Sequence, residues 1–142
     1  MVRTVLSVED DDATHFLLDI AFQEMGPDFR LYRVTDALEA LQFLSHTGPF
    51  TDSPRPDLIL SNLNMPGMGG IELLRRIQND NRWKDIPVVV FSSSKLESDR
   101  AKCLALGAKH YISKPAAYRD FMSAVKTACG YADGTITASV PG

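Results

Sequence analysis

The stretch "LILSNLNMPGMGG" at residues 58–70 decides the fold. Its first residues are almost all apolar and indicate a buried strand, and the glycines and proline that follow indicate a turn before a helix. A second apolar run, "IPVVVF" at residues 86–91, is typical of a strand covered on both faces. Such strands belong to parallel sheets that carry helices on both sides, so we expect an α/β protein.

Strand and helix patterns alternate along the rest of the chain. We expect five strands, at residues 4–8, 29–34, 57–62, 86–91 and 109–113. We expect a helix after each strand, at residues 13–25, from an Asp36 cap onward, and at 70–80, 97–106 and 117–129. In the first helix, the apolar face is predicted to consist of Phe16, Leu17, Ile20 and Ala21. Five such units predict a doubly wound, five-stranded parallel sheet.

The chain is predicted to form one domain. Residues 1–130 contain all the periodic segments, and residues 131–142 have little periodicity and are predicted to be a flexible tail. The stretch "HTGPFTDSPRP" at residues 46–56 is interpreted as a long loop within the domain rather than as a linker.

Composition and charge argue against several kinds of partner. The 142 residues are 44% hydrophobic and carry a net charge of −3, which gives no general attraction for nucleic acid or for an anionic membrane surface. The apolar runs are too short to span a bilayer. The thiols of Cys103 and Cys129 have no metal-type spacing and suit a reducing compartment, so we expect a cytoplasmic protein.

Polar side chains follow four of the predicted strands, where a parallel sheet brings them to one edge. They are the carboxylates Glu9 and Asp10, the amide Asn62, the hydroxyl Ser92 and the ammonium group of Lys114. Paired carboxylates are suited to hold Mg²⁺, and Ser92 and Lys114 are suited to hydrogen-bond the oxygens of a phosphoryl group. We therefore expect a functional site at this edge.

These motifs resemble the receiver domain of two-component response regulators, a flavodoxin-like module similar to the chemotaxis regulator. The resemblance rests on Glu9-Asp10, "NMPGMGG" at residues 64–70, Ser92 after "PVVVF", and Lys114-Pro115 after "YIS". The separations of 30 residues from Asn62 to Ser92, and of 22 from Ser92 to Lys114, agree with the family pattern. The resemblance covers about residues 3–129 and implies the strand order 2-1-3-4-5.

The resemblance also implies roles for individual residues. It implies a metal site made by Glu9, Asp10 and the backbone carbonyl of Asn64, and phosphoryl contacts from Ser92 and Lys114. The protein is then expected to be a signalling regulator rather than an enzyme, with a histidine kinase or another two-component protein as its partner and no organic cofactor.

Further features of the family have counterparts here. Tyr111 occupies the place of an aromatic switch, and Lys114-Pro115 the place of a cis peptide bond. The face around residues 95–129 is the docking surface that the resemblance implies. The loop at residues 46–56 and the stretch "IPVVVFSSS" are similar to single-domain regulators that partner phytochrome-type kinases. As an alternative to a switch, Tyr111 is interpreted as a packing residue.

The sequence departs from the family at the phosphoacceptor, where an aspartate is expected and Asn62 stands. A carboxylate is ionised at neutral pH and attacks phosphorus, whereas an uncharged amide forms no acyl phosphate. Mg²⁺ binding is expected to be weakened as well, because one carboxylate is lost. We therefore expect signalling by protein contacts without aspartyl phosphorylation, with Asn62 in a structural role.

Two alternatives stay open. The first is a conventional Mg²⁺-dependent phosphoacceptor whose aspartate has been replaced by Asn62 in this sequence. The second is an unrelated flavodoxin-like enzyme or small-ligand binder, which is disfavoured because the loop after the first strand is acidic and has no glycine-rich phosphate cradle. The oligomeric state is not predicted.

Overall fold

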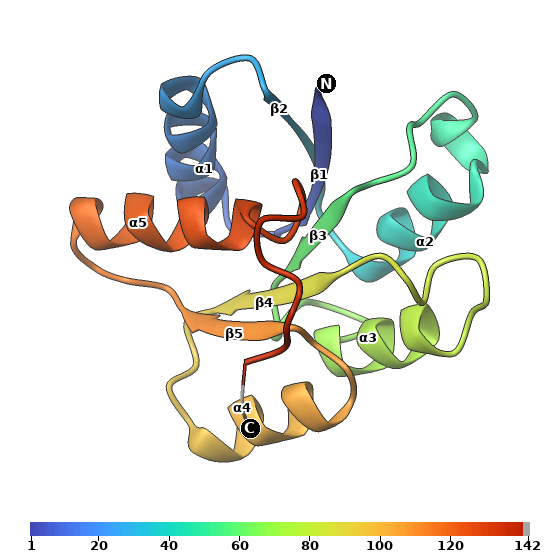
Figure 1. The fold of residues 1–142 in the computed structure, drawn as a ribbon. Helices are drawn as coiled ribbons and strands as arrows, with labels where there is room; N and C mark the ends of the chain where they lie inside the picture. The colour runs from blue at the N-terminus through green and yellow to red at the C-terminus, as the bar shows by residue number, and fades with distance from the viewer. Residues whose placement is uncertain (141–142) are drawn as a thin grey trace.

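A computed structural model describes residues 1–140, which form one parallel sheet wrapped by helices (Figure 1). The strands are β1 (Arg3–Val8), β2 (Phe29–Val34), β3 (Leu58–Ser61), β4 (Val88–Ser92) and β5 (His110–Ser113). The strand order is β2-β1-β3-β4-β5, and each neighbouring pair is parallel. The predicted fold class and strand order are therefore confirmed.

The helices divide between the two faces of the sheet. They are α1 (Asp12–Met25), α2 (Ala37–Ser45), α3 (Gly70–Gln78), α4 (Glu97–Ala105) and α5 (Tyr118–Cys129), with a short 3₁₀ helix η1 (Gly48–Phe50) in the loop after α2. Helices α1 and α5 lie together on one side, and α2, α3 and α4 lie on the other (Figure 1). This division follows from right-handed crossovers on either side of the first strand.

The alternation of side chains along the strands separates two hydrophobic cores. In β4, Val88 and Val90 pack with α2 and α3, whereas Val89 and Phe91 pack with α1 and α5. All five residues of β4 are buried, which confirms the prediction of a strand covered on both faces. Both cysteines are free and buried, and burial raises the pKa of Cys103 to about 11 and that of Cys129 to about 12.

The predicted apolar face of the first helix is correct only in part, because Ala21 is buried and Leu17 packs against the core but Phe16 does not. Phe16 is 65% exposed, and the buried positions of α1 are Thr14, Leu18, Ala21 and Phe22. The helix carries apolar residues around most of its circumference, so periodicity alone permits two faces. Contact with α5 and the sheet selects the one that includes Leu18 and Phe22.

The predicted boundary at residue 130 also needs correction. Tyr131 and Ala132 are buried in the core of α1 and α5, and Ile136 packs against it. The Val140 N–H donates to the Lys109 carbonyl at 2.8 Å, beside the start of β5. The packed domain therefore extends past the predicted boundary, and residues 141–142 of the predicted tail lie outside the described residues. None of the helices in residues 1–140 combines the length and apolar composition that a membrane span requires.

Helix α1 begins with a side-chain cap. Asp11 is its N-cap, and its Oδ2 accepts hydrogen bonds from the Thr14 N–H at 3.1 Å and from the Thr14 hydroxyl at 2.7 Å. These bonds lower the pKa of Asp11 below its ordinary value because they favour the ionised carboxylate. The cap fixes the start of the helix directly after the polar end of β1.

Replacing this cap should weaken the fold in a pH-dependent way. We expect Asp11→Ala to lower the free energy of unfolding by about 1 kcal/mol near neutral pH, since two capping bonds are lost. A carboxylate whose pKa is lowered by folding contributes stability above its unfolded pKa and loses it as pH falls through the folded pKa. Urea unfolding should therefore show a gap near neutral pH that closes in acid. Asp52→Ala, at an exposed loop position, is the control, and a gap independent of pH would contradict the capping role.

Candidate functional site

The carboxyl ends of the strands bring the predicted polar residues to one edge of the sheet. Glu9 follows β1, Asn62 follows β3, Ser92 ends β4 and Lys114 follows β5. The Asn62 N–H donates to the Val8 carbonyl at 3.0 Å, and the Lys114 N–H donates to the Ser92 carbonyl at 2.7 Å. The backbone hydrogen bonds therefore continue one residue beyond the strands. They hold the backbones of Asn62 and Lys114 next to the ends of the neighbouring strands, so the polar side chains lie at one edge of the sheet.

The side-chain amide of Asn62 is the centre of the site. Its Nδ2 donates to Glu9 Oε2 at 3.1 Å, to Asp10 Oδ1 at 3.1 Å and to the Asn64 carbonyl at 3.2 Å. The amide has two N–H donors, so the three acceptors share them. Asn62 is only 7% exposed, and its amide satisfies one backbone carbonyl and two carboxylates.

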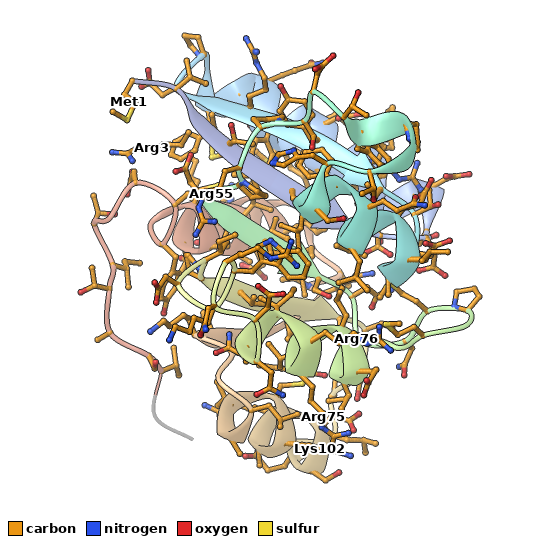
Figure 2. All side chains as sticks on the ribbon, turned by 90° about the vertical axis from the view of Figure 1, so that its right-hand side faces the viewer. Met1, Arg3, Arg55, Arg75, Arg76 and Lys102 are labelled. Atoms are coloured by element: carbon orange, nitrogen blue, oxygen red, sulfur yellow. The ribbon has the colours of Figure 1, made fainter. Side chains whose placement is uncertain are left out.

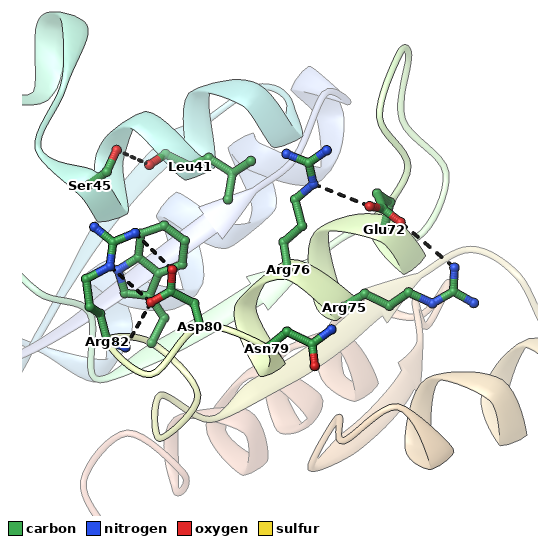
Figure 3. A pocket seen from close by; sticks show the side chains of 9 residues that line it. Leu41, Ser45, Glu72, Arg75, Arg76, Asn79, Asp80 and Arg82 are labelled. Atoms are coloured by element: carbon green, nitrogen blue, oxygen red, sulfur yellow. Dashed lines mark hydrogen bonds and ion pairs between the residues drawn. The ribbon is translucent and has the colours of Figure 1, made fainter.

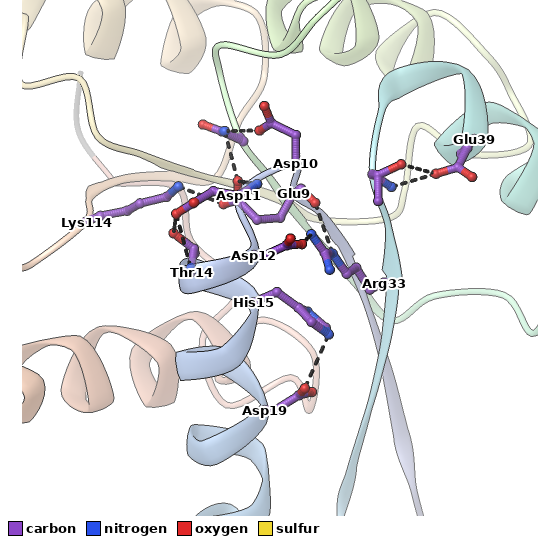
Figure 4. A network of polar contacts seen from close by, with 12 residues as sticks. Glu9, Asp10, Asp11, Asp12, Thr14, His15, Asp19, Arg33, Glu39 and Lys114 are labelled. Atoms are coloured by element: carbon purple, nitrogen blue, oxygen red, sulfur yellow. Dashed lines mark hydrogen bonds and ion pairs between the residues drawn. The ribbon is translucent and has the colours of Figure 1, made fainter.

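Lys114 neutralises the buried carboxylate of Glu9. The Lys114 Nζ lies 2.7 Å from Glu9 Oε1, with side-chain exposures of 14% and 3% (Figure 4). The Asp11 N–H donates to Glu9 Oε2 at 3.1 Å, the same oxygen that faces the Asn62 amide. Both oxygens of Glu9 therefore have partners, which a buried carboxylate requires.

Ser92 and Tyr111 contact the loop after β4. Ser92 is fully buried, and its Oγ accepts a hydrogen bond from the Ser94 N–H at 3.2 Å. The Tyr111 hydroxyl donates to the Ser94 carbonyl at 2.9 Å, and the Ser113 hydroxyl donates to the same oxygen at 3.0 Å. Tyr111 is 5% exposed and packs in the core of α2 and α3, so it has the contacts of a packing residue. A switch role for Tyr111 stays a prediction.

The cis peptide bond implied at Lys114-Pro115 is not found. Within residues 1–140 the structure has no cis peptide bond, so this bond is trans. Proline lowers the preference for trans without abolishing it, which is why the residue pair alone does not determine the isomer.

Sequence reasoning missed two residues that shape the site. Arg33 of β2 donates through Nε to the Glu9 carbonyl at 3.1 Å and through Nη2 to Asp12 Oδ1 at 2.8 Å (Figure 4). The position of Arg33 near Glu9 follows only from the register of β1 with β2, in which Arg33 pairs with Ser7. Gly70 approaches the Asn62 carbonyl so closely that a Cβ would overlap it, which explains a glycine at the start of α3.

The donor set differs from that of a carboxylate-rich metal site. The three oxygens that the resemblance assigns to Mg²⁺ belong to Glu9, Asp10 and Asn64, and all three accept hydrogen bonds from Asn62. Within residues 1–140 no three acidic, histidine or cysteine side chains gather as ligands of a metal ion. These residues therefore do not fit a magnesium site built on three carboxylates.

Comparison with known proteins identifies the family. The family model "Response regulator receiver domain" matches residues 5–126, which is most of the chain. This protein belongs to that family. Response regulator Rcp1 of Synechocystis is 34% identical over 124 residues, which cover 87% of this chain and 84% of Rcp1. The two-component response regulator ARR17 of Arabidopsis thaliana is 34% identical over 119 residues, 78% of this chain and 74% of ARR17.

Solved structures agree with the fold of this receiver. The phosphorylated cyanobacterial phytochrome response regulator RcpA superimposes with a TM-score of 0.88 at 33% identity, covering 96% of this chain and 98% of RcpA. The Mn²⁺-bound form of Rcp1 superimposes with a TM-score of 0.85 at 32% identity, covering 97% and 99%. The family consists of signalling regulators that interact with histidine kinases and other two-component proteins.

Proposed function

We propose that this receiver acts in two-component signalling through protein contacts, without aspartyl phosphorylation at position 62. The observation that carries the proposal is the set of three hydrogen bonds from the Asn62 amide to Glu9, Asp10 and the Asn64 carbonyl. An uncharged amide cannot form an acyl phosphate. In this position it also satisfies the acceptors that the resemblance assigns to a metal ion.

The amide of Asn62 stabilises the two carboxylates as a cation would, although it carries no net charge. Its N–H groups carry partial positive charge and lie about equally far from the carboxylates of Glu9 and Asp10, at 3.1 Å from each. The Lys114 ammonium group supplies a full positive charge on the other side of Glu9. The acceptor oxygens of Glu9 and Asp10 therefore have donors without a metal ion, and we propose that Mg²⁺ binds weakly because it must displace the amide.

The proposed docking face offers exposed apolar surface. Leu96, which precedes α4, is 63% exposed, and Tyr118, the first residue of α5, is 48% exposed. Both lie within the face around residues 95–129 that the resemblance implies. Aromatic and large aliphatic side chains of this kind supply binding energy in protein interfaces. A histidine kinase or another two-component protein is the proposed partner.

Restoring an aspartate should destabilise the metal-free protein. In Asn62→Asp, two attractive contacts at 3.1 Å become contacts between like charges. Each costs roughly 5 kcal/mol at an effective dielectric constant near 20 before any relaxation. Asp10 is exposed and can turn toward solvent, so we expect a net loss of about 2 kcal/mol in the free energy of unfolding in EDTA. Denaturant unfolding of both proteins measures it.

Excess Mg²⁺ should then stabilise the variant much more than the parent protein. A ligand at a hundred times its dissociation constant contributes about 2.7 kcal/mol to a protein that binds it only when folded. Asn81→Asp adds the same charge at an exposed, distant position and should behave like the parent protein. Equal stabilisation of the parent protein and Asn62→Asp by Mg²⁺ would refute the proposal that the amide weakens the metal site.

A further inference from the structure

A cavity lies away from this edge, between α2 and the carboxyl end of α3 (Figure 3). Its volume is about 560 Å³, within the range of small-molecule sites. Three arginines line it, Arg75 and Arg76 from α3 and Arg82 from the loop that follows. Leu41 of α2 and Trp83 add apolar surface, and we call this cavity the arginine groove.

The carboxylates in the groove do not saturate the guanidinium groups. Arg76 Nε lies 3.3 Å from one oxygen of Glu72, and Arg75 Nη1 lies 3.8 Å from the other. All three of these side chains are about half exposed, and surface pairs of this kind contribute little energy. A guanidinium group has five N–H donors, so Arg75 and Arg76 keep donors for an incoming anion.

The third arginine is held in place from several directions. Arg82 binds Asp80 through Nε at 3.0 Å and through Nη2 at 2.9 Å. Its guanidinium carbon lies 4.3 Å above the centre of the Trp83 ring, and Arg55 donates to its backbone carbonyl. Arg55 lines a smaller cavity of about 170 Å³ that shares Arg82 and Trp83 with the groove. The two cavities together present four guanidinium groups against the carboxylates of Glu72 and Asp80.

The basic side chains of the chain are concentrated in residues 53–114, the segment that supplies the arginines of the groove. Residues 1–52 contain three basic and ten acidic side chains, whereas residues 53–114 contain ten basic and six acidic ones. Figure 2 labels Arg55, Arg75, Arg76 and Lys102 in a view from the side of α2 and α3. The arginines therefore attract a compact anion to the groove. A long polyanion such as nucleic acid would extend beyond the groove and would be repelled by the acidic side chains of residues 1–52.

We propose that the arginine groove binds a small ligand that carries two or more phosphoryl groups. Planar guanidinium groups bind phosphoryl oxygens in pairs, and several arginines on two neighbouring segments match a ligand of several negative charges. The apolar wall of Leu41 and the Arg82–Trp83 stack provides a surface for an attached organic group. This site is separate from Asn62 and does not depend on the proposed function.

Trp83 is the only tryptophan in the chain, so its fluorescence reports on the groove. The probes are inorganic tripolyphosphate and ATP, titrated without Mg²⁺ at about 0.15 M salt. We expect a saturable fluorescence change and a dissociation constant at least about tenfold higher in Arg75→Gln/Arg76→Gln, which loses charge-assisted hydrogen bonds. The matched control is Arg30→Gln/Arg119→Gln, which removes the same charge from exposed positions elsewhere and should bind like the parent protein.

The two probes distinguish the sources of phosphoryl groups. Similar affinities would show that the phosphate chain suffices, and tighter ATP binding would show that the apolar wall contacts the nucleoside; either result supports the site. Arg82→Gln provides a second test on the opposite side of the groove, with folding of every variant checked by urea unfolding. Absence of saturation, equal weakening in the control, or citrate binding as tightly as tripolyphosphate would overturn the proposal.

Discussion

After incubation with a small-molecule phosphodonor and Mg²⁺, this receiver is expected to carry no acid-labile phosphate, whereas Asn62→Asp is expected to acquire one phosphoryl group. A carboxylate with a pKa near 4 is ionised at neutral pH and attacks phosphorus; the amide of Asn62 does not. The remaining residues of the pocket, Ser92 and Lys114, are held at the same edge of the sheet, where the Lys114 N–H bonds the Ser92 carbonyl at 2.7 Å. Intact mass with a hydroxylamine step measures the acyl phosphate.

The control variant makes the same substitution, asparagine to aspartate, at a different position. Asn81→Asp adds a carboxylate at an exposed site in the loop before β4, which is at the opposite end of that strand from Ser92, and it should stay unlabelled. Stoichiometric acyl phosphate on the parent protein would refute the interpretation of Asn62. An unlabelled Asn62→Asp would show instead that the rest of the pocket no longer supports phosphoryl transfer, which depends on positioning by several groups.

The architecture could be predicted from the sequence because its signals are local. The run "IPVVVF" requires a strand buried on both sides, and β4 at Val88–Ser92 is buried at every position. The Asp36 cap was visible as a single residue before a helical pattern, and its Oδ1 accepts the Glu39 N–H at 2.8 Å. The strand order was implied by the resemblance to the receiver family, and the structure confirms it.

Features that depend on tertiary contacts could not be predicted from the sequence pattern. Phe16 and Leu18 are both apolar candidates for the core, and packing against α5 and the sheet decides that Leu18 is buried. The burial of Tyr131 and Ala132 has no periodic signal, since they follow the last turn of α5. The sequence predicts the residues of the site, but the contacts of the Asn62 amide depend on distances that residue spacing does not reveal.

The buried ion pair between Lys114 and Glu9 gives the largest stability effect that we expect. Their charged atoms lie 2.7 Å apart with side-chain exposures of 14% and 3%, so neither group is well hydrated. Removing one partner of such a pair leaves an uncompensated charge and costs about 3 kcal/mol or more. We therefore expect Lys114→Met to lower the free energy of unfolding by about 3 kcal/mol. Lys126→Met, at an exposed position of α5, should change it by less than about 0.5 kcal/mol.

A double-mutant cycle separates the ion pair from the packing of the lysine chain. In Glu9→Gln/Lys114→Met the buried charge is gone, and the Asn62 amide still has Asp10 and the Asn64 carbonyl as acceptors. The double variant should therefore be more stable than Lys114→Met alone, because removing the charge offsets part of the loss. Additive effects of the two substitutions would show that Lys114 stabilises the site through its aliphatic chain and that the charge of Glu9 is balanced by the neighbouring N–H donors alone.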